Sequence, residues 1–251
     1  MSSERQLDDT NNPWWGEHLH RYQAAANLLG KEKPLKVLDI ACGTGFGSDL
    51  LAKLGHSVVG GDISKNDVET CGQKYQRPNL VFQVVDGTNM PFANDTFDCV
   101  VSFETIEHTT QYQKMLLEFK RVVNKNGLLI ISTPNFLINS PTGKVLNPFH
   151  TQEWKYEELA KLLEATFSNV KLMGQQYVRY RNKKSVKYKI ANIVENILYM
   201  RGVRKLPLKL QDSIMKAIIN EPMYPVITDF NLTENIEEIK LCKTFFAVCR
   251  L

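Results

Sequence analysis

A glycine-rich turn between an apolar run and a helical segment is the feature that most constrains this chain. Residues 37–40 predict a short buried strand, and glycines follow it at positions 43, 45 and 47. Residues 48–54 then have helical spacing. Glycine lets the backbone approach a ligand closely, and the amino end of a helix offers unpaired N–H groups and the positive end of its dipole. The pattern therefore predicts a nucleotide-like ligand at this turn.

Acidic residues end the next two predicted strands. Residues 57–62 end in Asp62, roughly 20 residues beyond the turn, where an acid can bond the hydroxyls of a ribose. Residues 80–86 end in Asp86. Open α/β sheets bind ligands at the carboxyl ends of their strands, so both acids are expected near the ligand of the glycine turn. Either acid could instead bond its own turn.

Strands and helices continue to alternate along the chain, which predicts an α/β fold with a mostly parallel sheet. Further strands are predicted at 97–103, 128–132, 169–175 and 244–251, and helices at about 13–30, 115–123 and 157–167.

This series of motifs resembles the class I S-adenosylmethionine-dependent methyltransferases over nearly the whole chain. The acid in Asp39-Ile-Ala-Cys-Gly-Thr-Gly45, two residues before the first small residue, is the methyltransferase form of the glycine turn, and NAD-binding folds usually lack it. The resemblance implies a Rossmann-like sheet of seven strands, mostly parallel, with helices on both faces. The seventh strand would lie antiparallel beside the sixth.

The resemblance also implies S-adenosylmethionine as the cofactor and S-adenosylhomocysteine as the product. The glycine turn would hold the methionyl part, Asp62 the ribose, and Asp86 the exocyclic amine of the adenine, which Ile63 would flank. Arg21 could pair with the methionyl carboxylate, or it could be solvated charge on a helix face. The implied cofactor-binding residues are Asp39, Ala41, Gly43, Gly45, Asp62, Ile63, Asp86, Gly87, Phe103 and Arg21.

The segment just after the fourth strand carries the candidate catalytic residues Glu104, Glu107 and His108. Histidine ordinarily titrates near neutral pH, so His108 is placed to act as a general base. If the segment is helical, the three side chains share one face and could bind a cation, with His150 as a further ligand. A similar pattern binds a divalent metal in ubiquinone-biosynthesis and small-RNA methyltransferases. The metal would be Mg²⁺ or another hard ion. The alternatives are a metal-free His108 base and a structural Glu104.

About 65 residues separate the sixth and seventh predicted strands, far more than an ordinary loop. The resemblance and this insertion predict a helical segment at 1–34 over the cofactor cleft, a cofactor-binding domain at 35–177 and 244–251, and an inserted helical cap at 178–243. Residues 186–198 and 208–220 have helical periodicity, and residues 229–238 are acidic. The basic stretch 179–209 could meet an anionic substrate, a phosphate or a membrane surface, or it could be a solvated helix face.

Four segments at 17–22, 102–108, 132–135 and 147–150 resemble a bacterial subgroup of small-molecule methyltransferases, often associated with sugar, polysaccharide or secondary biosynthesis. Thr44 departs from it, because an acid frequently stands there, and the basic insertion matches no pattern of the subgroup. The expected reaction is O-methylation of a hydroxyl on a sugar or other small metabolite. The alternatives are N-methylation of an amine or amino sugar, RNA 2′-O-methylation, a non-catalytic cofactor-binding assembly protein and an NAD-dependent reductase.

Composition adds few constraints. The net charge of +4 does not imply nucleic acid, and no RNA-binding module is recognised, so a nucleic-acid partner is not expected. The five cysteines form no Cys-x-x-Cys pair and are expected to be reduced and buried. No apolar run approaches membrane-spanning length and no signal peptide is evident, so the chain is expected to be cytoplasmic.

Overall fold

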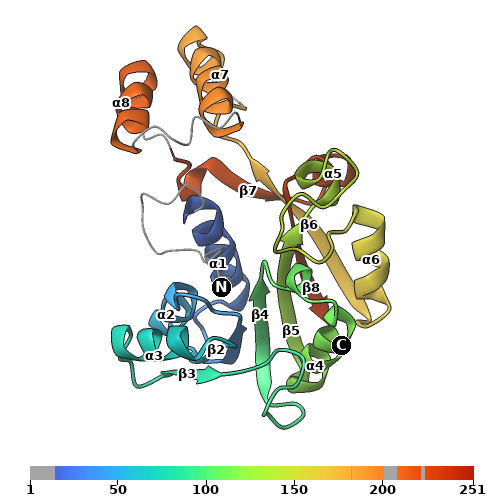
Figure 1. Ribbon diagram of the computed structural model, residues 1–251. Coiled ribbons are helices and arrows are strands. Elements are labelled where there is room, and N and C mark those ends of the chain that lie inside the picture. Colours follow the sequence, from blue (N-terminus) through green and yellow to red (C-terminus); the bar gives the residue numbers. More distant parts are fainter. Residues whose placement is uncertain (1–14, 182, 201–207, 222–223) are drawn as a thin grey trace. The chain divides into compact units, whose positions relative to one another are not determined.

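The computed structural model describes residues 15–181, 183–200, 208–221 and 224–251 (Figure 1). Trp14, Arg201, Arg204 and Lys205, which belong to the predicted first helix and the basic insertion, lie outside the described residues. The chain divides into two compact units. In its described part, the larger unit holds residues 21–176 and 232–251, and the smaller unit holds 15–20 and 177–231.

Eight strands of the described chain form one sheet, in the order β3-β2-β1-β4-β5-β8-β6-β7. Strands β1 to β5 pair in parallel, and β8 lies antiparallel between β5 and β6. The strands are β1 (Lys36–Ile40), β2 (Ser57–Asp62), β3 (Leu80–Val84), β4 (Phe97–Phe103), β5 (Val123–Pro134), β6 (Asn169–Tyr177), β7 (Phe230–Thr233) and β8 (Thr244–Arg250).

Helices connect these strands, and most lie where the helical periodicity predicted them. They are α1 (Trp15–Leu29), α2 (Phe46–Lys53), α3 (Lys65–Lys74), α4 (Tyr112–Val122), α5 (Phe136–Asn139), α6 (Tyr156–Glu164), α7 (Val186–Met200), α8 (Leu208–Ile219) and α9 (Ile236–Ile239), with short 3₁₀ turns η1 (Ile106–His108) and η3 (Ile227–Asp229). None of the described helices has both the length and the apolar character that crossing a membrane requires.

The expected sheet of seven strands is wrong, because the insertion contributes an eighth strand, β7, next to β6. Only four residues form it, and they begin the stretch that is acidic in the sequence. Phe230 and Leu232 alternate with Asn231 and Thr233, but this alternation is too short to be recognised as a strand pattern. The insertion is therefore not wholly helical.

The last part of the predicted insertion packs with the larger unit. Ile239 is buried in the same apolar cluster as Phe245 of β8. The side-chain amide of Asn135 donates hydrogen bonds to the carbonyls of Lys240 and Cys242, at 3.0 and 2.8 Å. Residues 232–243 of the predicted insertion thus belong to the larger unit. Residues 178–231 of the insertion belong to the smaller unit. The role of this insertion as a substrate cap stays a prediction.

Apolar clusters cover both faces of the sheet, because successive residues of a strand point to opposite faces. Leu38 of β1 belongs to the cluster that contains Phe119 of α4. Val37 belongs to the other cluster, with Ala25 of α1 and Leu51 of α2. Helices therefore lie on both faces, as predicted. The carboxyl ends of the parallel strands lie together at one end of the sheet. The five cysteines are free and buried.

Candidate functional site

The glycine turn follows β1 and adopts left-handed backbone conformations. Ala41, Gly43 and Gly45 have φ angles of 59°, 54° and 74°. A β-carbon added at Gly43 would meet nothing within 4 Å, whereas one at Gly45 would approach Cys71 and Phe82 to 2.8 Å. Gly43 is therefore the position where the backbone leaves room for a ligand, and Gly45 is required for packing against α3 and β3.

Helix α1 packs against the start of α2 beside this turn. A β-carbon at Gly47 would overlap the ring of Tyr22 from α1. The bare backbone at Gly47 lets the Tyr22 hydroxyl donate to Asp39 Oδ1 at 3.0 Å, and the Ser48 hydroxyl donates to Asp39 Oδ2 at 2.6 Å. Asp39 is fully buried. Its side chain therefore fixes α1 and α2 around the turn, a role that local sequence spacing does not reveal.

Burial raises the pKa of Asp39 from 3.8 to about 7, although the hydrogen bonds from Ser48 and Tyr22 oppose the rise. The folded protein therefore holds a proton between about pH 4 and pH 7 that the unfolded chain releases. The stability linked to Asp39 is fully present below pH 3.8 and is lost as pH rises toward 7.

Asp39→Asn is expected to remove this pH dependence, because the amide stays neutral throughout. Urea unfolding at about pH 5 and about pH 8 should show a smaller loss of unfolding free energy in the variant than in the native protein. The pKa of Glu107 is also raised, so Glu107 too makes the unfolding free energy fall as pH rises. The informative quantity is therefore the difference in this fall between the variant and the native protein. An identical loss in both would contradict the assignment to Asp39.

Asp62 lies at the carboxyl end of β2, as predicted, and faces the glycine turn. Its Oδ2 accepts a hydrogen bond from the Gly43 N–H at 3.0 Å, and its Oδ1 accepts one from the Ser64 N–H at 2.9 Å. Ser64 caps α3 by accepting from the Asp67 N–H. Asp62 is half-buried, and the neighbouring Ile63 is 73% exposed. The acid thus joins the turn to α3 and keeps lone pairs for a ligand.

Asp86 is exposed beyond β3 and bonds its own turn. Its Oδ1 accepts from both the N–H and the hydroxyl of Thr88, each at 2.8 Å. Gly87 is buried, and a β-carbon there would approach Met115 to 3.0 Å. Phe103, at the end of β4, packs edge-on against Tyr22 at a centroid distance of 4.9 Å. Contacts of these residues with an adenine ring stay predictions.

Arg21 lies one residue before Tyr22 on α1 and is fully buried. Its Nη1 donates to the side-chain oxygen of Gln175 on β6 at 2.6 Å, across 154 residues of sequence. The alternative that Arg21 is a solvated charge on the helix surface is wrong, because its side chain is buried. A contact between Arg21 and a methionyl carboxylate stays a prediction.

The expected helix face formed by Glu104, Glu107 and His108 is wrong. Glu104 has a φ of 50° and precedes a 3₁₀ turn of only three residues, so the i, i+3, i+4 geometry of an α-helix does not apply. The Ser132 hydroxyl of β5 donates to the Glu104 carboxylate at 2.7 Å. Glu104 therefore faces β5.

Glu107 is fully buried, and the Thr133 hydroxyl donates to its Oε2 at 2.9 Å. Its Oε1 is buried without a hydrogen-bond partner among the described residues. Burial, followed by the nearby charge of Glu104, raises the pKa of Glu107 well above the ordinary value. Both effects favour the protonated, neutral form of Glu107.

His108 is fixed by the segment that contains His150. The carbonyl of Phe149 can only accept, so Nδ1 of His108 donates to it, at 3.1 Å. In the neutral ring Nε2 then carries the lone pair, and this atom lies 3.9 Å from Oε1 of Glu107. The two histidine rings are 4.9 Å apart and nearly perpendicular. The structure thus brings His108 and His150 together, and their shared role as metal ligands stays a prediction.

Hydrogen bonds from the 147–153 segment account for this proximity. The Thr151 N–H donates to the Glu107 carbonyl at 2.7 Å, and the Gln152 amide donates to the carbonyls of Ile106 and Thr109 at 3.1 and 2.8 Å. These contacts cross more than 40 residues of sequence. Sequence reasoning missed them, because neither residue belongs to a motif.

Both ring nitrogens of His150 already have partners. Nδ1 donates to Glu153 at 2.7 Å, and Nε2 faces the side-chain amide nitrogen of Asn147 at 2.9 Å. The Asn147 oxygen accepts from the Phe149 N–H, which fixes the orientation of that amide. Possible metal-binding atoms of Glu107, His108 and His150 lie within 4.8 Å of one another, and Glu104 is not in this group. Metal binding through His150 would require Asn147 or Glu153 to move.

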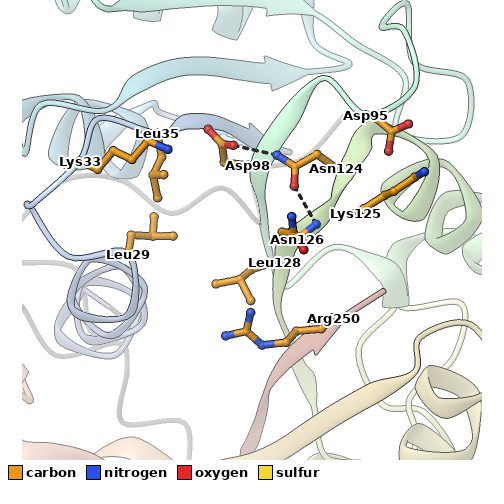
Figure 2. Close-up of a pocket in the computed structure, with 10 residues that line it drawn as sticks. All are labelled: Leu29, Lys33, Leu35, Asp95, Asp98, Asn124, Lys125, Asn126, Leu128 and Arg250. Carbon is orange, nitrogen blue, oxygen red and sulfur yellow. Dashed lines mark hydrogen bonds between the residues drawn. The ribbon is translucent and has the colours of Figure 1, made fainter.

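A separate pocket of about 610 Å³ lies at the opposite edge of the sheet, where β1, β4 and β5 begin (Figure 2). Lys33 and Leu35 line it before β1, and Arg250 lines it at the end of β8. Asp98 accepts from the Asn124 amide at 2.7 Å within it. None of the predicted site residues lines this pocket.

Comparison with known proteins relates the sheet domain to methyltransferases. Residues 38–131 match the family described as "Methyltransferase domain". A "probable S-adenosylmethionine-dependent methyltransferase" of Mycobacterium tuberculosis is 32% identical over 178 residues, which cover 69% of this chain and 63% of that protein. A ubiquinone biosynthesis O-methyltransferase of Pelagibacter ubique is 28% identical over 155 residues, which cover 57% of this chain and 65% of that protein.

The chain thus spans less than two thirds of the length of these curated relatives. Among solved structures, a methyltransferase from Thermotoga maritima, described as a possible histamine N-methyltransferase, superimposes with a TM-score of 0.57. The two chains are 14% identical, and the match covers 92% of this chain and 88% of the other. This last likeness shows the fold alone.

Proposed function

We propose that this protein, whose residues 38–131 form a class I S-adenosylmethionine-dependent methyltransferase domain, methylates a hydroxyl group of a sugar or another small metabolite. The observation that carries the choice of a hydroxyl acceptor is the fixed His108 ring, whose Nδ1 donates to the Phe149 carbonyl and whose Nε2 carries the lone pair. A hydroxyl must lose its proton to be methylated, and a histidine held in this form can take it.

The residues at the glycine turn fit the cofactor. Gly43 has open space where a β-carbon would stand, and each Asp62 oxygen accepts one backbone N–H, although a carboxylate offers about four lone-pair sites. Asp62 would hold the ribose, and the turn would hold the methionyl part. When bound, the cofactor supplies an electrophilic methyl group on a sulfonium centre.

The residues of the protein orient the acceptor and remove the proton from its hydroxyl group. Phe149 holds the His108 ring through its carbonyl, and Nε2 of His108 takes the proton of the acceptor hydroxyl. Burial raises the pKa of Glu107 and so favours its neutral form beside this histidine. Since catalysis of this kind depends on alignment, the bonds from Thr151 and Gln152 act as positioning contacts for His108.

We infer that this site works without a metal ion. Asn147 and Glu153 occupy the two nitrogens of His150, and Glu104 bonds Ser132 on the next strand. Of the four residues predicted as ligands, His150 and Glu104 are thus engaged with other protein groups. Magnesium also prefers several oxygen ligands over imidazole nitrogen, and only Glu107 in the close group offers oxygen.

The test is a transfer assay with isotope-labelled methyl cofactor and a panel of sugars, other hydroxyl metabolites, amines and short RNAs. We expect transfer to a hydroxyl acceptor, unchanged after exhaustive chelation with EDTA. Loss of transfer on chelation, restored by Mg²⁺, would contradict the metal-free mechanism. Transfer only to amines or only to RNA would contradict the acceptor class.

A further inference from the structure

Helix α7 in the smaller unit presents an apolar stripe to solvent. Val186, Ile190 and Ile193 stand at positions i, i+4 and i+7, which share one helix face, and they are 68%, 47% and 58% exposed. The helix buries a different face, because Ala191 is fully buried against Met215 of the neighbouring α8 (Figure 1). α7 therefore has two apolar faces, and described residues of this unit cover only one of them.

The sequence around the exposed stripe is basic. Residues 178–211 contain ten lysines and arginines and one glutamate, a net charge of +9. The whole chain has a net charge of +4, so the remaining residues together carry −5. Helix geometry places Lys187 on one side of the stripe and Lys189 on the other. Both lysines are exposed, and neither forms an ion pair with a described residue.

We propose that α7 docks the protein on an anionic phospholipid surface. An exposed apolar stripe with lysines on both sides is the pattern of a helix that lies in the plane of a membrane interface. Val186, Ile190 and Ile193 would enter the boundary of the acyl chains, and Lys187 and Lys189 would contact the lipid headgroups.

The charge and packing of this face favour lipid over other partners. A second copy of the chain would bring its own lysines against those of the first, which like charges oppose. Single-stranded nucleic acid would use the phosphate charge and exposed aromatic rings. Tyr188, however, packs in the cluster between α7 and α8, and its hydroxyl donates to Glu221 at 3.1 Å. A lipid surface with anionic headgroups satisfies the aliphatic stripe and the lysines together.

Co-sedimentation of the full-length protein with vesicles tests the proposal. We expect binding to vesicles that contain phosphatidylglycerol and weak binding to pure phosphatidylcholine. Raising the salt should weaken the interaction, because headgroup contacts are screened. Docking is independent of the proposed methyl transfer, so failure in either assay does not decide the other.

Two variants separate the apolar and the ionic contributions. Ile190→Gln is expected to lower vesicle affinity about tenfold, because it removes an aliphatic side chain from the membrane. Lys187→Gln with Lys189→Gln is expected to lower it roughly fivefold for each lysine. The matched controls are Leu241→Gln, at a 76% exposed leucine of the other unit, and Lys144→Gln, at an exposed lysine of that unit. Circular dichroism and thermal unfolding verify that each variant folds.

Binding that depends on anionic lipid, on Ile190 and on both lysines, and that survives the controls, supports the proposal. Absence of binding to phosphatidylglycerol vesicles overturns it. So does binding that Ile190→Gln leaves unchanged, since that result indicates adsorption by charge alone. Ile190-dependent dimerisation in sedimentation velocity, or RNA binding that competes with the vesicles at equal concentration, would assign the face to another partner.

Discussion

Replacing His108 with asparagine is expected to lower kcat for hydroxyl methylation by roughly 10²–10⁴, the usual contribution of a general base. The amide cannot take a proton, but it can still bond the Phe149 carbonyl that now accepts from His108 Nδ1. The segment should therefore remain folded. Steady-state kinetics with a saturating acceptor give kcat, and calorimetry with S-adenosylhomocysteine is expected to show unchanged affinity.

Two further measurements identify the role of His108. In the native protein kcat should rise with pH over the range in which histidines titrate, because only the neutral ring accepts a proton, and the variant should lack this rise. Thr151→Ala serves as the comparison, since it removes one positioning bond, from the Thr151 hydroxyl to the Glu107 carbonyl, but retains the imidazole, so the rise with pH should remain. Full activity of the asparagine variant would exclude His108 as the base.

Asp62→Ala is expected to weaken S-adenosylhomocysteine binding roughly ten- to hundredfold, since hydrogen bonds to a charged group contribute about 1.5–3 kcal/mol. The carboxylate also accepts from the N–H groups of Gly43 and Ser64, so its loss loosens the glycine turn as well as the ribose contact. Isothermal titration calorimetry measures the affinity, and urea unfolding measures how much of the effect is structural.

Asp62→Asn is the conservative comparison, because it retains one acceptor oxygen and should lose less affinity than the alanine variant. Glu69→Ala changes an exposed acid on α3 and should leave binding intact. If Asp62→Ala bound the product as tightly as the native protein, the ligand would have to lie away from the end of β2.

The sheet and the strand ends that carry the glycine turn and Asp62 could be predicted because their signals are local. Short apolar runs and the glycine turn are readable within about ten residues, and they put Asp62 at the correct strand end. The supports of the site could not be predicted, because they join distant residues. Tyr22 reaches Asp39 across 17 positions, and Arg21 reaches Gln175 across 154.

Two errors have specific physical causes. Glu104 was expected on a helix, but a left-handed backbone at this residue turns its carboxylate toward Ser132, and spacing alone cannot reveal such a φ angle. The eighth strand was missed because four residues of β7 next to an acidic stretch carry little apolar signal. In both places tertiary contacts outweigh the local pattern.

The position of β8 makes the insertion an exchangeable module. Gln175 of β6 pairs with Thr244 of β8, and Thr244 also pairs with Pro134 at the end of β5. Gln175 and Thr244 are therefore neighbours in the sheet, although the long segment between them includes β7 of the same sheet. Loop-closure entropy grows only slowly with length, so such a segment can lengthen, shorten or be replaced at little thermodynamic cost. The helix proposed to dock on lipid can then change while the sheet domain stays the same.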